Sequence, residues 1–232
     1  MNFICGIDEA GRGPVIGPMV VAAACAPDDR KFIEMGVRDS KKLLPLQRER
    51  LAPQIRNCCE YAVRVVPAEE IDEKRKIMTM NVLEVEIFAE VLRELLEKMK
   101  AKGADPKDVV IYADAPDVNE ERFADELRHR LGKEMIIISR HRADDLFPIV
   151  SAASIIAKTT RDALVRDIEK ELTKKMPLPL GSGYPSDPLT KRFLEEWVKR
   201  FGKLPSHTRK SWETAERLVK NKKNKKLDGF LS

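Results

Sequence analysis

The chain has 232 residues, 43% of them hydrophobic and 35% charged, which provides enough apolar surface for a core and enough charge for a solvated exterior. This composition excludes wholesale disorder. No apolar run approaches the ~18 residues of a membrane-spanning helix, and the N-terminus lacks the basic and apolar segments of a secretory signal. We therefore expect a globular, cytoplasmic protein without membrane association, and a monomer at this size.

The net charge of +5 is distributed unevenly. Nine Lys or Arg and two Glu lie between Lys203 and Lys226, a local balance of +7. This basic end indicates a polyanionic partner, although a solvated helix end and tail fits the charge equally well.

The four cysteines follow neither a metal-site nor a disulfide pattern. Cys58 and Cys59 are adjacent, and no CxxC spacing occurs. Cys5 and Cys25 lie in apolar segments typical of strands, where we expect buried, unpaired thiols.

In the first half of the chain, short apolar segments alternate with longer amphipathic ones, which predicts an α/β fold. Residues 3–8 and 20–25 are predicted strands around a turn rich in Gly and Pro, so we expect a hairpin. A helix over 46–56 and a strand over 61–66 follow. The apolar positions of residues 82–99 recur at three- and four-residue steps, which predicts a helix packed on a sheet.

The second half contains a strand over 109–113, a helix over 120–130 and a strand over 135–139. This unit requires a parallel strand pair with a right-handed crossover. The remaining predicted elements are a long helix at 148–172, a loop or linker at 175–188, and two C-terminal helices at 189–201 and 208–220.

Acidic residues follow three of the predicted strands. Asp8 and Glu9 follow the first, Asp114 the fourth, and Asp144 with Asp145 come a few residues after the fifth. Ligands of open α/β sheets bind at the carboxyl ends of the strands, so these acids can converge. Carboxylates without His or Cys suit Mg²⁺ or Mn²⁺. Acids at strand ends are also common capping residues, so their position alone does not establish a metal site.

Several sequence blocks occur in the order typical of one enzyme family. They are Ile7-Asp8-Glu9-Ala10-Gly11-Arg12-Gly13-Pro14 with Gly17-Pro18, Asp39-Ser40-Lys41-Lys42-Leu43, Ala143-Asp144 with Pro148, the run 151–158, Arg161-Asp162, and 181–187. Together they resemble type 2 ribonuclease H, ribonuclease HII. The archaeal form is the most similar, because of a helical C-terminal extension containing Arg209-Lys210-Ser211-Trp212.

The resemblance implies a ribonuclease H-like fold, a mixed five-stranded sheet flanked by helices with a helical C-terminal extension. We expect a catalytic domain over 1–187, the helical extension over 188–220 and a basic flexible tail over 221–232. The implied enzyme is an endoribonuclease that hydrolyses the RNA strand of RNA/DNA hybrids. It would also cut 5′ of single ribonucleotides in duplex DNA, leaving a 3′-hydroxyl and a 5′-phosphate, in ribonucleotide or primer removal.

The resemblance also implies a two-metal site for Mg²⁺ or Mn²⁺. The implied catalytic acids and metal ligands are Asp8, Glu9, Asp114 and Asp144. Two metals ~3.5–4 Å apart can stabilise the attacking water and the leaving oxygen of a displacement at phosphorus, so no side-chain nucleophile is needed.

Two of these assignments have an alternative nearby. Asp117 competes with Asp114, which we favour because it ends a predicted strand. The family's Lys-Ala-Asp reads Arg142-Ala143-Asp144 here, which leaves Asp145 as the alternative to Asp144. The spacing to the following proline favours Asp144.

Substrate recognition is implied for a glycine-rich loop, a tyrosine and a set of cations. Gly11-Arg12-Gly13 would sense the 2′-hydroxyl that separates RNA from DNA. The pattern argues against a dinucleotide-binding fingerprint, because the glycine spacing misses GxGxxG by one residue and leads into a strand. Tyr184 would pack on the sugar beside the junction, or else belong to the core. The implied phosphate contacts are Lys41, Lys42, Lys158 and Arg161, although Lys41 and Lys42 singly also fit solvated surface lysines.

Residues 224–231 resemble the clamp-binding motif of replication proteins. Asn224 replaces the usual Gln, and Leu231 replaces the second aromatic residue. Leu227, Phe230 and Leu231 would then contact a sliding clamp, and a frayed terminus is the alternative.

Two other functional classes are alternatives. One is a hybrid-binding protein that does not cleave, against which the four intact acids argue. The other is another enzyme of the same fold, such as a junction resolvase or an integrase, which shares the acids. The glycine-rich loop together with Tyr184 favours the ribonuclease.

Overall fold

The computed structural model describes residues 3–37, 43–116 and 119–228, with side chains through Lys220. Within these ranges no helix has the length and apolar character needed to cross a membrane. The chain forms two compact units. The first comprises Met1–Ala10, Val20–Val65 and Met78–Thr160, and the second comprises Gly11–Met19, Val66–Ile77 and Arg161–Ser232. Each unit thus combines distant segments, whereas the expected domains at 1–187 and 188–220 are consecutive; those boundaries stay a prediction.

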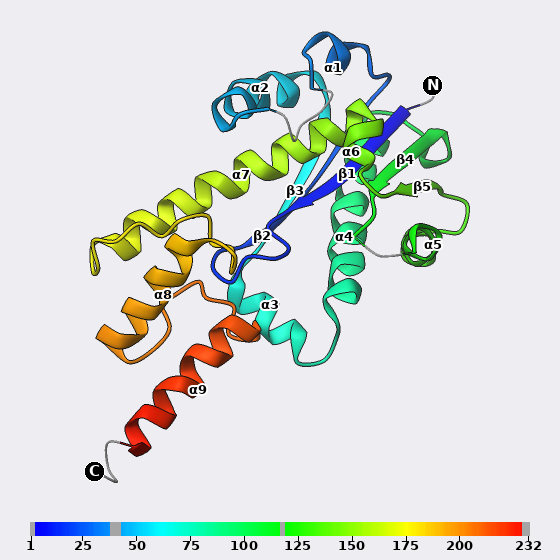
Figure 1. Cartoon of the computed structure of the whole chain (residues 1–232). Helices are drawn as coiled ribbons and strands as arrows, with labels where there is room; N and C mark the ends of the chain where they lie inside the picture. Colours follow the sequence, from blue (N-terminus) through cyan, green and yellow to red (C-terminus); the bar gives the residue numbers. More distant parts are fainter. Residues whose placement is uncertain (1–2, 38–42, 117–118, 229–232) are drawn as a thin grey trace. The chain divides into compact units, whose positions relative to one another are not determined.

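The sheet has five strands in the order β3-β2-β1-β4-β5 (Figure 1). The strands are β1 (Phe3–Ala10), β2 (Met19–Ala26), β3 (Glu60–Val66), β4 (Val109–Asp114) and β5 (Ile136–Arg140). β1 pairs antiparallel with β2 and parallel with β4, and β4 pairs parallel with β5. The predicted mixed five-stranded sheet with its N-terminal hairpin is confirmed. The whole of β2 is buried, which its small and apolar residues allow.

The helices are α1 (Arg30–Glu34), α2 (Pro45–Cys58), α3 (Ala68–Arg75), α4 (Met80–Ala101), η1 (Pro106–Asp108), α5 (Glu120–Leu131), α6 (Ala143–Leu146), α7 (Pro148–Thr173), α8 (Pro188–Phe201) and α9 (Glu213–Asp228). α4 begins where the Thr79 side chain accepts a hydrogen bond from the Val82 N–H. Phe88 of α4 and Phe123 of α5 pack edge to face, with ring centroids 5.3 Å apart. The apolar face predicted for residues 82–99 therefore also buries against α5.

The predicted last helix, 208–220, is wrong at both ends. Thr208 forms a β-bridge with Ile16, and His207 adopts a left-handed backbone with a φ of 63°. This segment pairs with another part of the chain instead of entering the helix. α9 then runs from Glu213 to Asp228, so its backbone continues into the expected tail.

The expectation of unpaired thiols at Cys5 and Cys25 is also wrong, because the structure joins them in a disulfide. The two residues face each other in the β1–β2 register, with their Cα atoms 4.1 Å apart. Their separation of 20 residues in the sequence gives no sign of this register. Cys58 and Cys59 are free.

The second unit has its own apolar core. Its fully or nearly fully buried residues include Val15, Ile16, Leu172, Leu180, Phe193 and Leu194. Asp187 caps α8 by accepting a hydrogen bond from the Leu189 N–H. The core joins residues near 16 to α8 and to the C-terminal half of α7.

Candidate active site

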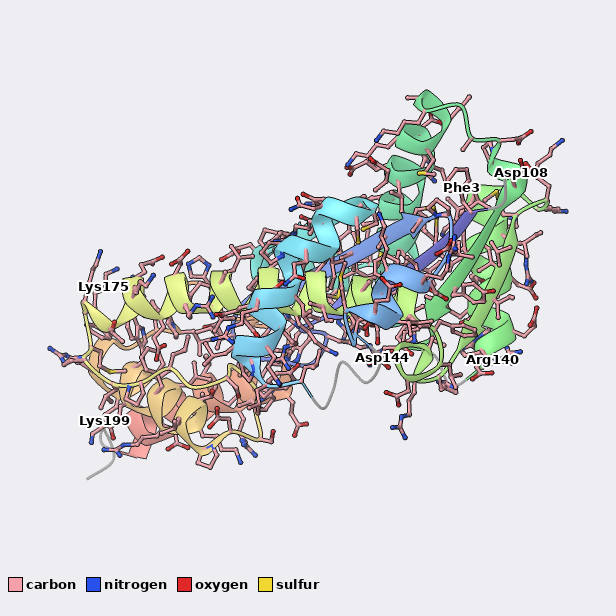
Figure 2. The ribbon with its side chains drawn as sticks, turned by 90° about the horizontal axis from the view of Figure 1, so that it is seen from above. Phe3, Asp108, Arg140, Asp144, Lys175 and Lys199 are labelled. Carbon is pink, nitrogen blue, oxygen red and sulfur yellow. A yellow bond between two sulfur atoms is a disulfide. The ribbon has the colours of Figure 1, made fainter. Side chains whose placement is uncertain are left out.

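The sheet topology brings the acids that follow separate strands to one end of the sheet. Asp8 lies in β1 and Asp114 ends β4, and these parallel strands pair Ile7 with Ala113. Asp144 lies in α6, directly after β5. Figure 2 shows Asp144 and the β5 terminus at one end of the sheet, and the starts of β1 and β4 at the other.

Asp8, Asp114 and Asp144 form one group, in which a carboxylate oxygen from each residue lies within 4.8 Å of the others. Asp8 is 4% exposed and Asp144 is 1% exposed. Burial, followed by the charge of Asp114, raises the pKa of Asp8 to about 7, although Lys158 and a hydrogen bond with Ser154 oppose the rise. Three crowded carboxylates of this kind attract a hard divalent cation.

Helix α7 supplies polar support to the group from one of its faces. Ser151, Ser154 and Lys158 follow each other at intervals of three and four residues. The Lys158 Nζ lies 3.8 Å from Asp144 Oδ2, and the Ser151 hydroxyl donates to the main-chain oxygen of Asp144 at 2.6 Å. Lys158, expected at a phosphate, therefore also faces an acid of the group. With Ser154 at Asp8, the helix both orients and partly neutralises the carboxylates.

Gly6 allows α7 to approach β1 this closely. A Cβ at Gly6 would lie 2.5 Å from the main-chain atoms of Ile149 and Val150. A side chain would push the start of α7 away from the strand that carries Asp8. The sequence carries a signal for this need for glycine, because an isolated glycine in an apolar strand often marks a close approach of another backbone segment. Neither Gly6 nor the role of Ser154 was predicted.

The fourth predicted ligand, Glu9, is not a member of the group that the described residues form. Its main-chain N–H donates to Asp8 Oδ1 at 2.7 Å, and neighbouring strand residues direct their side chains to opposite faces. A role for Glu9 as a ligand stays a prediction.

Asp144 and not Asp145 joins the group. Asp145 Oδ2 instead lies 2.6 Å from Arg142 Nη2 in an ion pair. Asp117, the alternative to Asp114, lies outside the described residues.

The predicted ribonucleotide-sensing loop lies in the second unit, together with Tyr184 and Arg161. Gly11 has a φ of +84°, and a Cβ there would lie 2.7 Å from the Pro18 oxygen and closer still to Arg161. A Cβ at Gly13 would make an ordinary contact, 3.6 Å from the Tyr184 ring. Gly11 is therefore needed for the loop conformation itself. A side chain at Gly13 would fit the loop and would only occupy space beside the Tyr184 ring.

Arg161 and Tyr184 pack on each other, with the guanidinium 5.4 Å from the ring centroid. Arg161 is 6% exposed, and burial lowers the pKa of its guanidinium. Tyr184 is 38% exposed, so it is not the core tyrosine of the alternative interpretation. The Tyr184 ring, held on one face by the buried Arg161 and exposed to solvent, can pack against a sugar.

Some predicted contacts cannot be located. Lys41, Lys42, Phe230 and Leu231 lie outside the described residues. Leu227 lies in α9, but its side chain is also outside them.

Comparisons with known proteins agree with this geometry. The family model described as "Ribonuclease HII" matches residues 5–215. Ribonuclease HII of Thermococcus kodakarensis is 45% identical over 226 residues, which cover 96% of this chain and 92% of that protein. The solved ribonuclease H2 from Pyrococcus horikoshii OT3 has a TM-score of 0.81 and 40% identity, and the match covers 94% of this chain and 98% of that one. The PCNA:RNase HII complex from Archaeoglobus fulgidus gives a TM-score of 0.79 and 40% identity, with 93% and 96% coverage.

These similarities extend over nearly the whole chain, and the range matched by the family model contains the positions of the acidic group. They support a ribonuclease over both alternatives, the hybrid-binding protein that does not cleave and another enzyme of the same fold. The chain belongs to the ribonuclease HII family and is an endoribonuclease of the ribonuclease H type that acts on RNA/DNA hybrids.

Proposed function

We propose that this endoribonuclease cuts the phosphodiester bond 5′ of a ribonucleotide, either in an RNA/DNA hybrid or at a single ribonucleotide in duplex DNA. The products would be a 3′-hydroxyl and a 5′-phosphate. The observation that carries the proposal is the group of Asp8, Asp114 and Asp144, which gathers three carboxylates without a His or Cys. Removal of ribonucleotides or primers during DNA replication and repair is the corresponding role, and the cytoplasm stays the expected location.

The acidic group fits Mg²⁺ or Mn²⁺. All three residues offer oxygen, the donor that these cations prefer. Burial and then the charge of Asp114 raise the pKa of Asp8 despite the opposing charge of Lys158, and a bound cation would offset both effects. Asp8, Asp114 and Asp144 would hold the cations, with Glu9 as the predicted fourth ligand. When bound, two divalent cations supply stabilisation of the attacking and leaving oxygens.

Residues of the chain itself would position the substrate. The loop Gly11-Arg12-Gly13 would contact the 2′-hydroxyl, because its small residues allow main-chain atoms to approach the sugar. Tyr184 would pack against the sugar beside the junction, with its ring supported by Arg161. Lys41, Lys42, Lys158 and Arg161 would attract the phosphates without reading base sequence.

The test compares two neighbouring acids on a labelled DNA duplex that carries one ribonucleotide. Asp144→Asn removes a member of the acidic group, and Asp145→Asn removes only the partner of Arg142. With Mg²⁺ or Mn²⁺ we expect a single cut 5′ of the ribonucleotide by the wild type and by Asp145→Asn. Asp144→Asn should lose about 100-fold in rate or more. An RNA/DNA hybrid and an all-DNA duplex serve as the substrate controls.

Three results would overturn parts of this proposal. Cleavage of the all-DNA duplex at a similar rate would refute ribonucleotide specificity. A cut 3′ of the ribonucleotide would refute the proposed products. A larger loss for Asp145→Asn than for Asp144→Asn would assign the ligand to Asp145.

We also propose that the C-terminal tail binds a sliding clamp. The solved Archaeoglobus fulgidus relative is in complex with PCNA, and the tail here carries the partial motif with Leu227, Phe230 and Leu231. Calorimetry with the full chain and a clamp should show binding that Phe230→Ala abolishes. Binding that is unaffected by Phe230→Ala would refute the role of the tail. The free chain is expected to be a monomer.

A further inference from the structure

The segment 207–212, just before α9, pairs with the loop 11–17 within the second unit. Its main chain makes two hydrogen bonds to the loop: the Gly17 N–H donates to the His207 oxygen at 2.9 Å, and the Arg209 N–H donates to the Val15 oxygen at 2.8 Å. These two bonds form the antiparallel bridge between Ile16 and Thr208. The two segments are about 190 residues apart in the sequence. The glycine-rich loop therefore has a dedicated support from the end of the chain.

Arg209 is the centre of this support. Its side chain is fully buried, with 0% exposure. The guanidinium donates to three main-chain oxygens of the loop: Nε to Gly17 at 3.1 Å, Nη1 to Arg12 at 2.7 Å, and Nη2 to Gly11 at 2.5 Å. A planar guanidinium presents several donors in a fixed fork, which suits three oxygens held at different angles.

These hydrogen bonds fix the direction of the peptide units. In a planar trans peptide the C=O of one residue and the N–H of the next point in opposite directions, and no described peptide bond is cis. Because the Gly11 and Arg12 oxygens face Arg209, the N–H groups of Arg12 and Gly13 face away from it. The Trp212 indole N–H donates to the Gly13 oxygen at 3.2 Å, which orients the next peptide unit from the same segment.

The support is itself anchored to α3. The Asp72 carboxylate accepts hydrogen bonds from the N–H groups of Lys210 and Ser211, at 2.8 and 3.0 Å, and from the Ser211 hydroxyl at 2.7 Å. The Arg209 guanidinium also lies 4.8 Å from the Trp212 ring centroid. The residues on either side of Arg209 are thus held while its side chain holds the loop.

We propose that Arg209 is a positioning residue for ribonucleotide recognition, which orients the Gly11–Gly13 main chain so that its N–H groups face the substrate sugar. This inference rests on the proposed function of the loop. Arg209 acts through the loop and does not contact the substrate. Lysine cannot replace it, because a single ammonium group cannot span the three oxygens.

The test measures recognition and loop order separately. Arg209→Lys keeps the positive charge, and Arg217→Lys, at an exposed position of α9, is the matched control. The first readout is the ratio of affinities for duplexes with and without a ribonucleotide, measured by fluorescence anisotropy in EDTA, together with kcat and KM in Mg²⁺. The second readout is amide hydrogen exchange of residues 11–17 in the free protein. Arg209→Ala with added guanidinium tests chemical rescue.

We expect Arg209→Lys to lower kcat/KM on the ribonucleotide duplex by about 100-fold, the effect of a small misplacement of a positioning group. The affinity ratio should fall towards one, and exchange of residues 11–17 should become faster. Arg217→Lys should match the wild type, and guanidinium should partly restore Arg209→Ala. An Arg209→Lys variant that is less stable but keeps the affinity ratio would overturn the proposal, since a purely structural role predicts that result.

Failure of the proposed function has a different signature. In that case the wild type itself shows no preference for the ribonucleotide, whereas hydrogen exchange still reports whether Arg209 orders the loop. Unchanged exchange in Arg209→Lys would overturn the positioning role. If Arg209→Lys does not fold, Trp212→Phe tests the same support, because it removes the indole donor to Gly13 and keeps an aromatic ring beside Arg209. Faster exchange of residues 11–17 with an unchanged affinity ratio in that variant would overturn the proposal, since loop order would then not govern recognition.

Discussion

The acidic group predicts that Asp8→Asn stabilises the metal-free protein, more at high pH than at low pH. Burial and the neighbouring carboxylates raise the pKa of Asp8 from 3.8 to about 7. The folded state therefore binds a proton that the unfolded state releases, and the free energy of unfolding decreases as the pH rises from about 4 through about 7. Asn carries no charge at any pH, so the variant avoids this loss.

The size of the effect follows from the two pKa values. Each unit of pKa difference corresponds to about 1.4 kcal/mol. The charged carboxylate of Asp8 then costs about 4 kcal/mol at pH 8 and about 2 kcal/mol at pH 5, where it is mostly protonated in the folded state. Any constant effect of the amide group, such as an altered hydrogen bond to Ser154, cancels between the two pH values. The remaining difference is about 2–3 kcal/mol in favour of Asp8→Asn at pH 8.

Guanidinium denaturation in EDTA, followed by circular dichroism at pH 5 and pH 8, measures this difference. Asp167→Asn is the control, because that carboxylate is 70% exposed and pairs with Lys170 on the surface. Added Mg²⁺ should reduce the stability advantage of Asp8→Asn at pH 8. Metal that binds only the folded wild type adds about 2.7 kcal/mol at 100 times its dissociation constant, and the variant lacks one ligand.

Two results would refute this reasoning. If Asp8→Asn destabilises the protein equally at both pH values, the pKa of Asp8 is not raised in the folded state. If Mg²⁺ stabilises the wild type and Asp8→Asn to the same extent, Asp8 does not contribute to the cation site.

Three further predictions concern close contacts of the backbone and the disulfide. Gly6→Ala should reduce the free energy of unfolding by about 1–3 kcal/mol, because its methyl group meets the main chain of α7; a midpoint equal to that of the wild type would contradict the close approach. Gly11→Ala should impair binding of a ribonucleotide duplex in anisotropy measurements far more than Gly13→Ala, since only Gly11 combines a positive φ with a blocked Cβ position. Reduction of the Cys5–Cys25 disulfide should lower the free energy of unfolding by about 3 kcal/mol for a loop of this length; thiol titration with and without denaturant checks its presence.

The sheet and the acidic group could be predicted because their signals are local. Each strand is a short apolar run bounded by turn residues, and an acid at a strand end is visible without knowledge of the fold. Parallel pairing of β1 with β4 then places Asp8 beside Asp114. The short helices α1 and α6 were missed because four or five residues carry too little periodicity to detect.

Features that depend on pairing between distant segments could not be predicted. The disulfide requires the register that sets Cys5 opposite Cys25, and apolar strands give no sequence signal for register. The start of α9 was misplaced for a similar reason. The helical pattern begins at Thr208, but pairing with Ile16 keeps this residue out of the helix.

Arg209 shows why such a residue escapes sequence reasoning although its surroundings are informative. An arginine in a basic C-terminal segment is expected at the surface, where it would meet a polyanion. Its burial is favourable only because the loop turns three carbonyl oxygens towards one point, and the loop does so only because Gly11 accepts a positive φ. Arg209 and Gly11 thus depend on each other, although about 200 residues separate them in the sequence. Replacement of Gly11 should therefore displace the Gly11 and Arg12 oxygens from Arg209, a penalty that adds to the backbone strain.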